Sequence, residues 1–265
     1  MMPLWDLHRG DGPLIVNVPH AGTFAPPAIA ARLTTAGQAW PDTDWHVEKL
    51  YAFARDEGAT LLCATHSRYV VDLNRDPSGT ALYPGADNTE LCPTRTFAGE
   101  PVYAPAEEPG EAEIGARRAT FFDAYHALLA GETARVRERH GFAVLLDGHS
   151  IASRVPRFFA GRLPDLNLGT NDGASCEPSV QALATDVIAT ASGFTHVVNG
   201  RFKGGYITRR YGRPAHGVHA LQLEMAQAGY MDEADPESFD AARAAPLARV
   251  LERLAIVLSE WRPSR

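Results

Sequence analysis

Four hydrophobic, strand-like runs in this sequence end on residues that bind metals, protons or anions. The runs are LIVNVPH, ending at His20, RYVVDLNR, ending at Arg75, AVLLDGHS, with His149, and VHALQLEM, with Glu224. In an open α/β sheet, ligands bind at the rim formed by the carboxyl ends of the strands. The pattern therefore predicts that these four distant segments converge on one active site.

Strand-like segments rich in Val, Ile and Leu alternate along the chain with helical ones, which is typical of a mainly parallel or mixed sheet flanked by helices. Apolar residues recur at helical spacing over 121–136 and 247–261, and Pro178 lies where the first turn of a third helix would begin. With 265 residues, 45% of them hydrophobic, the chain is long enough to bury a full core. We expect one α/β domain over residues 1–265.

Three long stretches rich in Gly, Pro, Asn and Asp interrupt this pattern, at 76–110, 153–178 and 199–214. Loops of this length in a compact domain are usually functional or disordered. Because these stretches directly follow the predicted strand ends, we expect them to form the walls of a pocket.

Composition and charge exclude several classes of protein. The net charge of −7 argues against nucleic-acid binding, which needs a basic excess. Cys63, Cys92 and Cys176 are odd in number and far apart, which argues against a disulfide framework or a thiolate zinc site and favours the cytoplasm. The sequence has neither a secretory leader pattern nor the ~20 consecutive apolar residues of a membrane helix. We therefore expect no membrane partner, and the sequence makes no prediction of oligomeric state.

A metal site is one interpretation of His20 and His149. A catalytic zinc ion commonly has three protein ligands, often two histidines and a carboxylate, and keeps a fourth position for water. Asp44 or Asp42 could supply the carboxylate. The competing interpretation is structural, because lone histidines are more often structural and either aspartate could cap the helix predicted after it.

Glu224 lies between the apolar residues Leu223 and Met225, where an unpaired carboxylate would be costly to bury. A water activated by a metal would be a suitable partner, and the glutamate could take its proton. The alternative is a glutamate on the polar face of an edge strand.

The segment 199–213 carries five basic residues and no acidic one. On an acidic protein, such a segment is either an anion-binding loop or a solvated basic surface.

Seven segments, in unbroken order, resemble the zinc-dependent N-formylglutamate amidohydrolase family, the deformylases of histidine catabolism. They are VPHAG (18–22), DTDWHVEKLY (42–51), SRYVVDLNR (67–75), DGHSI (147–151), LPDLNLGTNDGASC (163–176), NGRFKGGYITRRYG (199–212) and HALQLEMAQ (219–227). The resemblance implies a three-layer α/β/α domain around a twisted, mostly parallel mixed sheet, similar to the zinc-dependent exopeptidases.

The resemblance also implies the chemistry. Zinc would be held by His20, Asp44 and His149, with Asp42 as the alternative carboxylate, and Glu224 would be the general base. The expected reaction is hydrolysis of N-formyl-L-glutamate to L-glutamate and formate. Zinc and an arginine such as Arg75 would stabilise the tetrahedral oxyanion.

The two carboxylates of this small anionic substrate require fixed cations, and arginine binds a carboxylate through two parallel hydrogen bonds. Arg75 next to Asn74 resembles the pair with which zinc carboxypeptidases hold an α-carboxylate, although a structural salt bridge to Asp72 or Asp76 is the alternative. The second anion contact is expected from the segment after Asn199, with Arg209 favoured over Arg201, Lys203 and Arg210. Other predicted contacts in the two later loops are Gly205, Tyr206, Thr170 and Asn171.

Three other functions compete with this one. The nearest is a metal-dependent amidohydrolase of another N-acyl or N-carbamoyl acidic amino acid. A serine hydrolase using Ser150 beside His149 is disfavoured, because the chain lacks a G-x-S-x-G motif and adjacent residues on a strand point to opposite faces. The third is a non-catalytic small-anion binding protein on the same fold, for which the arginines alone would suffice.

Overall fold

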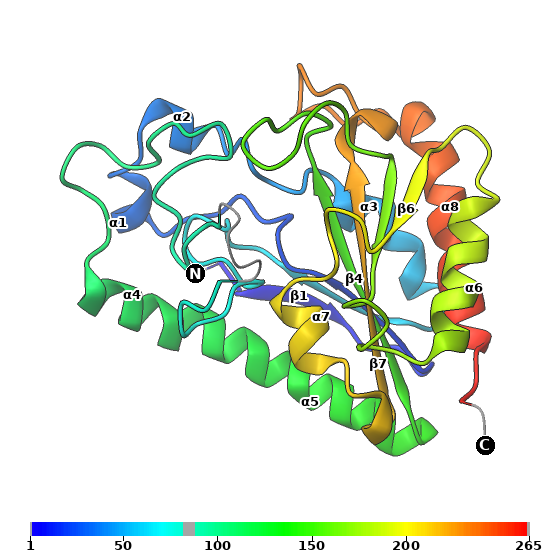
Figure 1. The fold of residues 1–265 in the computed structure, drawn as a ribbon. Coiled ribbons are helices and arrows are strands. Elements are labelled where there is room, and N and C mark those ends of the chain that lie inside the picture. Colours follow the sequence, from blue (N-terminus) through cyan, green and yellow to red (C-terminus); the bar gives the residue numbers. More distant parts are fainter. Residues whose placement is uncertain (1, 82–87, 264–265) are drawn as a thin grey trace.

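The computed structural model describes residues 2–81 and 88–263, in which seven strands form one mixed sheet (Figure 1). The strands are β1 (Trp5–His8), β2 (Leu14–Val18), β3 (Thr60–Ala64), β4 (Ala143–Ile151), β5 (Leu166–Gly169), β6 (His196–Val198) and β7 (Val218–Ala226). They lie in the order β1-β3-β2-β4-β7-β5-β6. Four of the neighbouring pairs are parallel, while β1 and β3, and β5 and β7, pair antiparallel.

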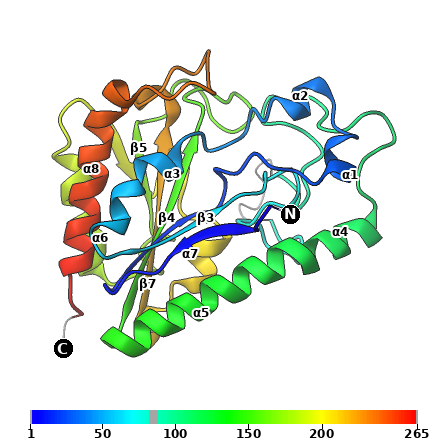
Figure 2. The ribbon, with the colours of Figure 1, turned by 180° about the vertical axis from the view of Figure 1, so that it is seen from behind.

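Helices cover both faces of this sheet, as the two opposite views in Figures 1 and 2 show. The helices are α1 (Pro27–Ala30), α2 (Thr35–Gln38), α3 (Val47–Leu50), α4 (Glu111–Arg117), α5 (Asp123–His140), α6 (Pro178–Ala189), α7 (Tyr206–Tyr211) and α8 (Ala241–Glu260). A π-helical turn at Arg118–Phe122 joins α4 to α5, and short 3₁₀ turns lie at Ala52–Arg55, Pro214–His216 and Gln227–Gly229.

The two faces of the sheet bury separate cores, because successive side chains of a strand point to opposite sides. On β4, Leu146 packs in the core shared with α3, α6 and α8, whereas Leu145 packs in the core shared with α5 and α7. The arrangement is three layers around a mostly parallel mixed sheet. The predicted α/β fold class is therefore confirmed.

The three predicted helices are present. The stripe at 121–136 lies in the π turn and α5, Pro178 is the first residue of α6, and the stripe at 247–261 lies mainly in α8. The last helix begins six residues earlier than its stripe, because Asp240 caps it by accepting hydrogen bonds from the backbone of Ala242 and Arg243. Among residues 2–81 and 88–263, no helix combines the length and apolarity needed to cross a membrane.

Three expectations about local structure were wrong. The run ending at Arg75 is a buried turn, not a strand, and its backbone is satisfied by side chains: Tyr103 Oη and Arg117 both donate to the carbonyl of Tyr69. The stretch 153–178 contains β5, and 199–214 contains α7. The third stretch, 76–110, has only isolated bridges in its described part, and its residues 82–87 lie outside the described residues.

Candidate metal centre and active site

The alternation of strands β4 and β7 brings polar side chains together on one face of the sheet. Asp147 and His149 lie two residues apart on β4, and Gln222 and Glu224 lie two apart on β7. The strand register pairs Asp147 with Gln222 and His149 with Glu224. All four therefore point to the face covered by α5 and α7, near the carboxyl ends of these parallel strands.

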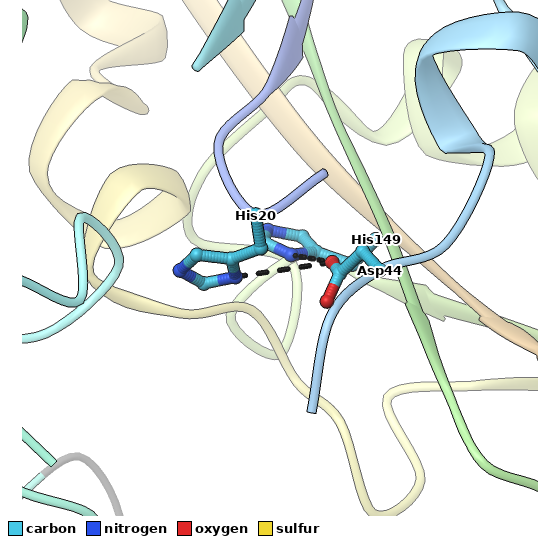
Figure 3. Close-up of side chains that lie close together, drawn as sticks. All are labelled: His20, Asp44 and His149. Carbon is cyan, nitrogen blue, oxygen red and sulfur yellow. Dashed lines mark hydrogen bonds and ion pairs between the residues drawn. The ribbon is translucent and has the colours of Figure 1, made fainter. Parts of the chain in front are cut away.

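His149 meets His20 and Asp44, which come from loops beyond this pair of strands (Figure 3). His20 follows β2, and its carbonyl accepts a hydrogen bond from the backbone N–H of Asp44 at 3.1 Å. Asp44 Oδ2 lies 3.0 Å from His149 Nδ1 and 3.8 Å from His20 Nδ1. One ligand atom of each residue lies within 4.8 Å of the others, and all three residues are buried.

The other ring nitrogens face two further buried aspartates. His20 Nε2 lies 2.8 Å from Asp72 Oδ1, and His149 Nε2 lies 2.9 Å from Asp147 Oδ2. A histidine that donates its Nε2 proton to a carboxylate presents the Nδ1 lone pair to a metal. Within the described residues, His20 Nδ1 is buried and has no hydrogen-bond partner. This unpartnered nitrogen and the two-histidine, one-carboxylate donor set fit a divalent metal such as zinc.

Asp44 is a more suitable ligand than Asp42. Arg68 Nη2 donates to Asp44 Oδ1 at 2.6 Å; burial alone would raise the pKa of Asp44, but Arg68 and His149 outweigh it and lower that pKa. Neither aspartate caps α3, whose N-cap is His46 without a side-chain hydrogen bond. Asp42 instead accepts hydrogen bonds from Tyr69 Oη and the backbone N–H of Phe97 and lies outside the cluster.

Glu224 is buried beside this cluster. Burial raises its pKa to about 7, and the negative charge of Asp44 adds to the shift while His149 opposes it. Gln222 Nε2 donates to Glu224 Oε2 at 3.1 Å, and this bond orients the carboxylate. The edge-strand alternative is wrong, because β7 lies between β4 and β5. A carboxyl group with this pKa can both accept and return a proton near neutral pH.

A cavity of about 640 Å³, including its open mouth, lies over these residues. Three arginines line it, Arg68 and Arg75 from the segment 67–75 and Arg201 from the segment after Asn199. Its complete lining is His20, Arg68, Asn74, Arg75, Asn88, Thr89, Phe97, His149, Ser150, Ile151, Phe158, Arg201, Phe202, Gly205, Gln222 and Glu224. The cavity is thus rich in fixed positive charge next to the candidate metal ligands.

Three of the predicted substrate-contact residues line this cavity. Arg75 Nε donates to Thr89 Oγ1 at 2.7 Å and lies 3.8 Å from Asp72, so the alternative salt bridge coexists with a place on the cavity wall. Asn74 Nδ2 lies 3.0 Å from His149 Nε2. The backbone N–H of Gly205 donates to Gln222 Oε1 at 2.7 Å.

The other four predicted contacts are not among the cavity-lining residues. Thr170 Oγ1 donates to Gln181, and Asn171 has a positive φ of 50° in a turn. The Tyr206 ring packs against His126 and Phe122, while Arg209 Nε donates to the carbonyl of Gly204 at 3.0 Å. From the same basic segment, Arg201 lines the cavity instead. A direct role for these four in substrate binding stays a prediction.

Sequence reasoning missed four residues of the site: Arg68, Asp72, Asp147 and Gln222. Two signals were available for them. Asp147 and Gln222 stand two positions before His149 and Glu224, on the same strand face, and such spacing predicts side-chain contact. Arg68 and Asp72 stand in the same motif as Arg75. A strand, which was expected there, would have pointed their side chains to the face opposite that of Arg75.

Ser150 does not form a catalytic pair with His149. Its Oγ accepts hydrogen bonds from Tyr230 Oη at 2.8 Å and from Gln227 Nε2 at 3.3 Å, on the other side of β4. The serine hydrolase alternative therefore has no support in this geometry.

Comparisons with known proteins agree with these observations. The model of the family described as N-formylglutamate amidohydrolase matches residues 12–231. A protein named N-formylglutamate deformylase from Pseudomonas aeruginosa is 47% identical, over 96% of this chain and 95% of its own length. One of the same name from Pseudomonas putida is 44% identical, over 97% and 96%. A crystal structure of N-formylglutamate amidohydrolase from Ralstonia eutropha superposes with a TM-score of 0.82 at 28% identity, covering 98% of both chains. A gene product from Agrobacterium tumefaciens shares the fold, with a TM-score of 0.70 at 16% identity and 96% of both chains covered.

Proposed function

Because this chain belongs to the N-formylglutamate amidohydrolase family, we propose that it hydrolyses N-formyl-L-glutamate to L-glutamate and formate with a bound zinc ion. The observation that carries the proposal is the buried group His20, Asp44 and His149 at a cavity lined by arginines. We further propose that residues 1–265 act as one domain in the cytoplasm, in the last step of a histidine degradation route.

His20, Asp44 and His149 are the residues that would hold the metal. When bound, zinc supplies Lewis acidity that makes water a nucleophile near neutral pH. Asp72 and Asp147 keep both imidazole rings oriented with Nδ1 toward Asp44. Arg68 holds the second oxygen of Asp44, and it keeps that carboxylate ionised.

Glu224 is the proton carrier of the proposed reaction. Its carboxylate takes a proton from the attacking water and returns it to the amide nitrogen, so that the C–N bond breaks and formate and L-glutamate leave. A pKa of about 7 suits both transfers, since the group must be a base in one step and an acid in the next. Gln222, anchored to the backbone of Gly205, directs Glu224 through a hydrogen bond.

The arginines of the cavity recognise the two carboxylates of the substrate. Arg75, held by Thr89, takes the α-carboxylate, and Arg201 takes the side-chain carboxylate. Arg201 replaces Arg209 in this role because it lines the cavity. Oxyanion stabilisation by an arginine, either Arg75 or Arg68, contributes a few kcal/mol.

A formate-release assay on purified protein tests the proposal. Protein stripped with a chelator should lose activity on N-formyl-L-glutamate and regain it when one equivalent of zinc is added. N-acetyl- and N-succinyl-L-glutamate in the same assay distinguish a deformylase from an amidohydrolase of larger acyl groups. Zinc-loaded, folded protein that releases no formate would refute the proposed function.

A further inference from the structure

A second hollow, of about 550 Å³ including its open mouth, adjoins the catalytic cavity. Both are bordered by Phe97, Ser150 and Ile151, which therefore form the wall between them. Beyond this wall the second hollow is lined by five apolar residues, Pro41, Ala98, Ala152, Val155 and Pro156, and by four polar ones, Asp42, Thr43, Arg154 and Gln227. The proposed reaction gives this space no role.

The shared wall stands next to the candidate metal ligands. Ser150 and Ile151 directly follow His149, and the backbone N–H of Ser150 donates to Asp44 Oδ2 at 3.2 Å. The guanidinium of Arg68, which also binds Asp44, lies 5.0 Å from the centre of the Phe97 ring. In the proposed reaction the scissile carbonyl lies beside the metal ligands. Its acyl substituent, which is hydrogen in a formyl group, therefore faces the shared wall.

Phe97 is the one large ring in this wall, and its backbone position does not depend on its side chain. The N–H of Phe97 donates to Asp42 Oδ2 at 2.8 Å, while the ring packs edge-on against Phe158 with centroids 5.0 Å apart. Truncating the ring therefore removes bulk between the two hollows and leaves the anchoring hydrogen bond in place.

We infer that Phe97 determines acyl-group size: its ring limits the acyl group to formyl by closing the catalytic cavity off from the apolar hollow behind it. This inference rests on the proposed function. A formyl group has hydrogen where acetyl has a methyl group, and one methylene in a fitted apolar pocket changes kcat/KM by about 10- to 200-fold. With the ring removed, longer alkyl chains reach the apolar residues of this hollow, such as Val155 and Pro156.

The test compares kcat/KM for N-formyl-, N-acetyl- and N-butanoyl-L-glutamate in wild type, Phe97→Ala and Phe202→Ala. Phe202 is the matched control, because it loses the same side-chain atoms and lines the catalytic cavity but not the second hollow. Phe97→Ala should raise the acetyl-to-formyl and butanoyl-to-formyl ratios at least about tenfold. Phe202→Ala should leave both ratios within about twofold of wild type.

A second variant guards against misfolding. Phe97→Leu keeps an apolar side chain and the bond to Asp42, and it should raise the acetyl ratio less than Phe97→Ala does. If both variants fold but keep the wild-type acetyl-to-formyl and butanoyl-to-formyl ratios, and wild type is active on the formyl substrate, the role of Phe97 is overturned. The proposed function would still stand in that case. Wild type that cleaves the acetyl and butanoyl substrates as well as the formyl one would overturn the role of Phe97 too. Wild type inactive on N-formyl-L-glutamate would refute the proposed function, and the inference would fall with it.

Discussion

Substituting Gly205 by alanine should damage catalysis much more than stability. A Cβ atom at this position would lie 2.3 Å from Asn74 Nδ2, although real Cβ atoms essentially never have contacts below 3.0 Å. The Asn74 amide must therefore move by roughly 0.7 Å, the difference between the two distances. It cannot turn away freely, because its Oδ1 accepts a hydrogen bond from the backbone N–H of Ile207 at 2.8 Å.

The displacement reaches the candidate metal centre through the contact of Asn74 with His149. Asn74 Nδ2 lies 3.0 Å from His149 Nε2, so pushing the amide disturbs the ring that presents Nδ1 to Asp44. Overpacking of this kind costs about 1–3 kcal/mol of folding free energy. Misplacing a catalytic group by about 1 Å can cost about 100-fold in rate. We therefore expect kcat/KM to fall by roughly two orders of magnitude in a protein that still folds.

The assay pairs formate release with urea unfolding, and Gly131→Ala is its control. Gly131 lies in α5, where an added Cβ meets no atom within 4 Å, and alanine there should stabilise the helix by about 0.5–1 kcal/mol without changing kcat/KM. If Gly205→Ala is folded and retains kcat/KM within a few-fold of wild type, the proposed coupling of Gly205 to His149 through Asn74 is wrong.

Three further predictions concern groups at the site. Glu224→Gln should keep zinc and substrate affinity by calorimetry while kcat falls by about 10²–10⁴-fold; near-normal turnover would remove the proton-carrier role. Arg68→Met removes one partner of a buried ion pair and leaves Asp44 Oδ1 without its guanidinium, so urea unfolding of the metal-free protein should show a loss of about 3–5 kcal/mol. Its control, Arg32→Met, breaks a partly exposed ion pair and should cost at most about 1 kcal/mol; equal losses would contradict the argument. Asp147→Asn should weaken zinc binding by about 10- to 100-fold in a chelator competition, whereas unchanged affinity would show that Asp147 does not orient His149.

The layered fold and the centre of the site were predictable from local sequence signals. The runs containing His149 and Glu224 form strands, as their hydrophobic, Val- and Leu-rich sequences predicted, and Pro178 begins a helix as its fixed φ favours. The residue types alone left Asp42 and Asp44 both open as the carboxylate, and the family resemblance favoured Asp44, which the structure brings together with His20 and His149.

The remainder depends on tertiary contacts that no local pattern encodes. Hydrophobic residues 69–73 look like a strand, yet Arg117, far along the chain in α4, takes the backbone carbonyls that a neighbouring strand would use. Likewise, the basic segment predicted an anion contact, but the path of the backbone decides which arginine reaches the cavity. That path turns Arg201 toward the cavity, while Arg209 donates to the Gly204 carbonyl within its own segment.

The order of strands in the sheet has a consequence for biosynthesis. The strand β4, which carries His149, lies between β2 near the amino terminus and β7 near the carboxyl terminus. A nascent chain that has not yet released β7 from the ribosome lacks one neighbour of β4 and lacks Glu224 altogether. A translation product truncated before β7 therefore keeps the candidate metal ligands His20, Asp44 and His149 but has neither Glu224 nor the strand that flanks β4 on that side.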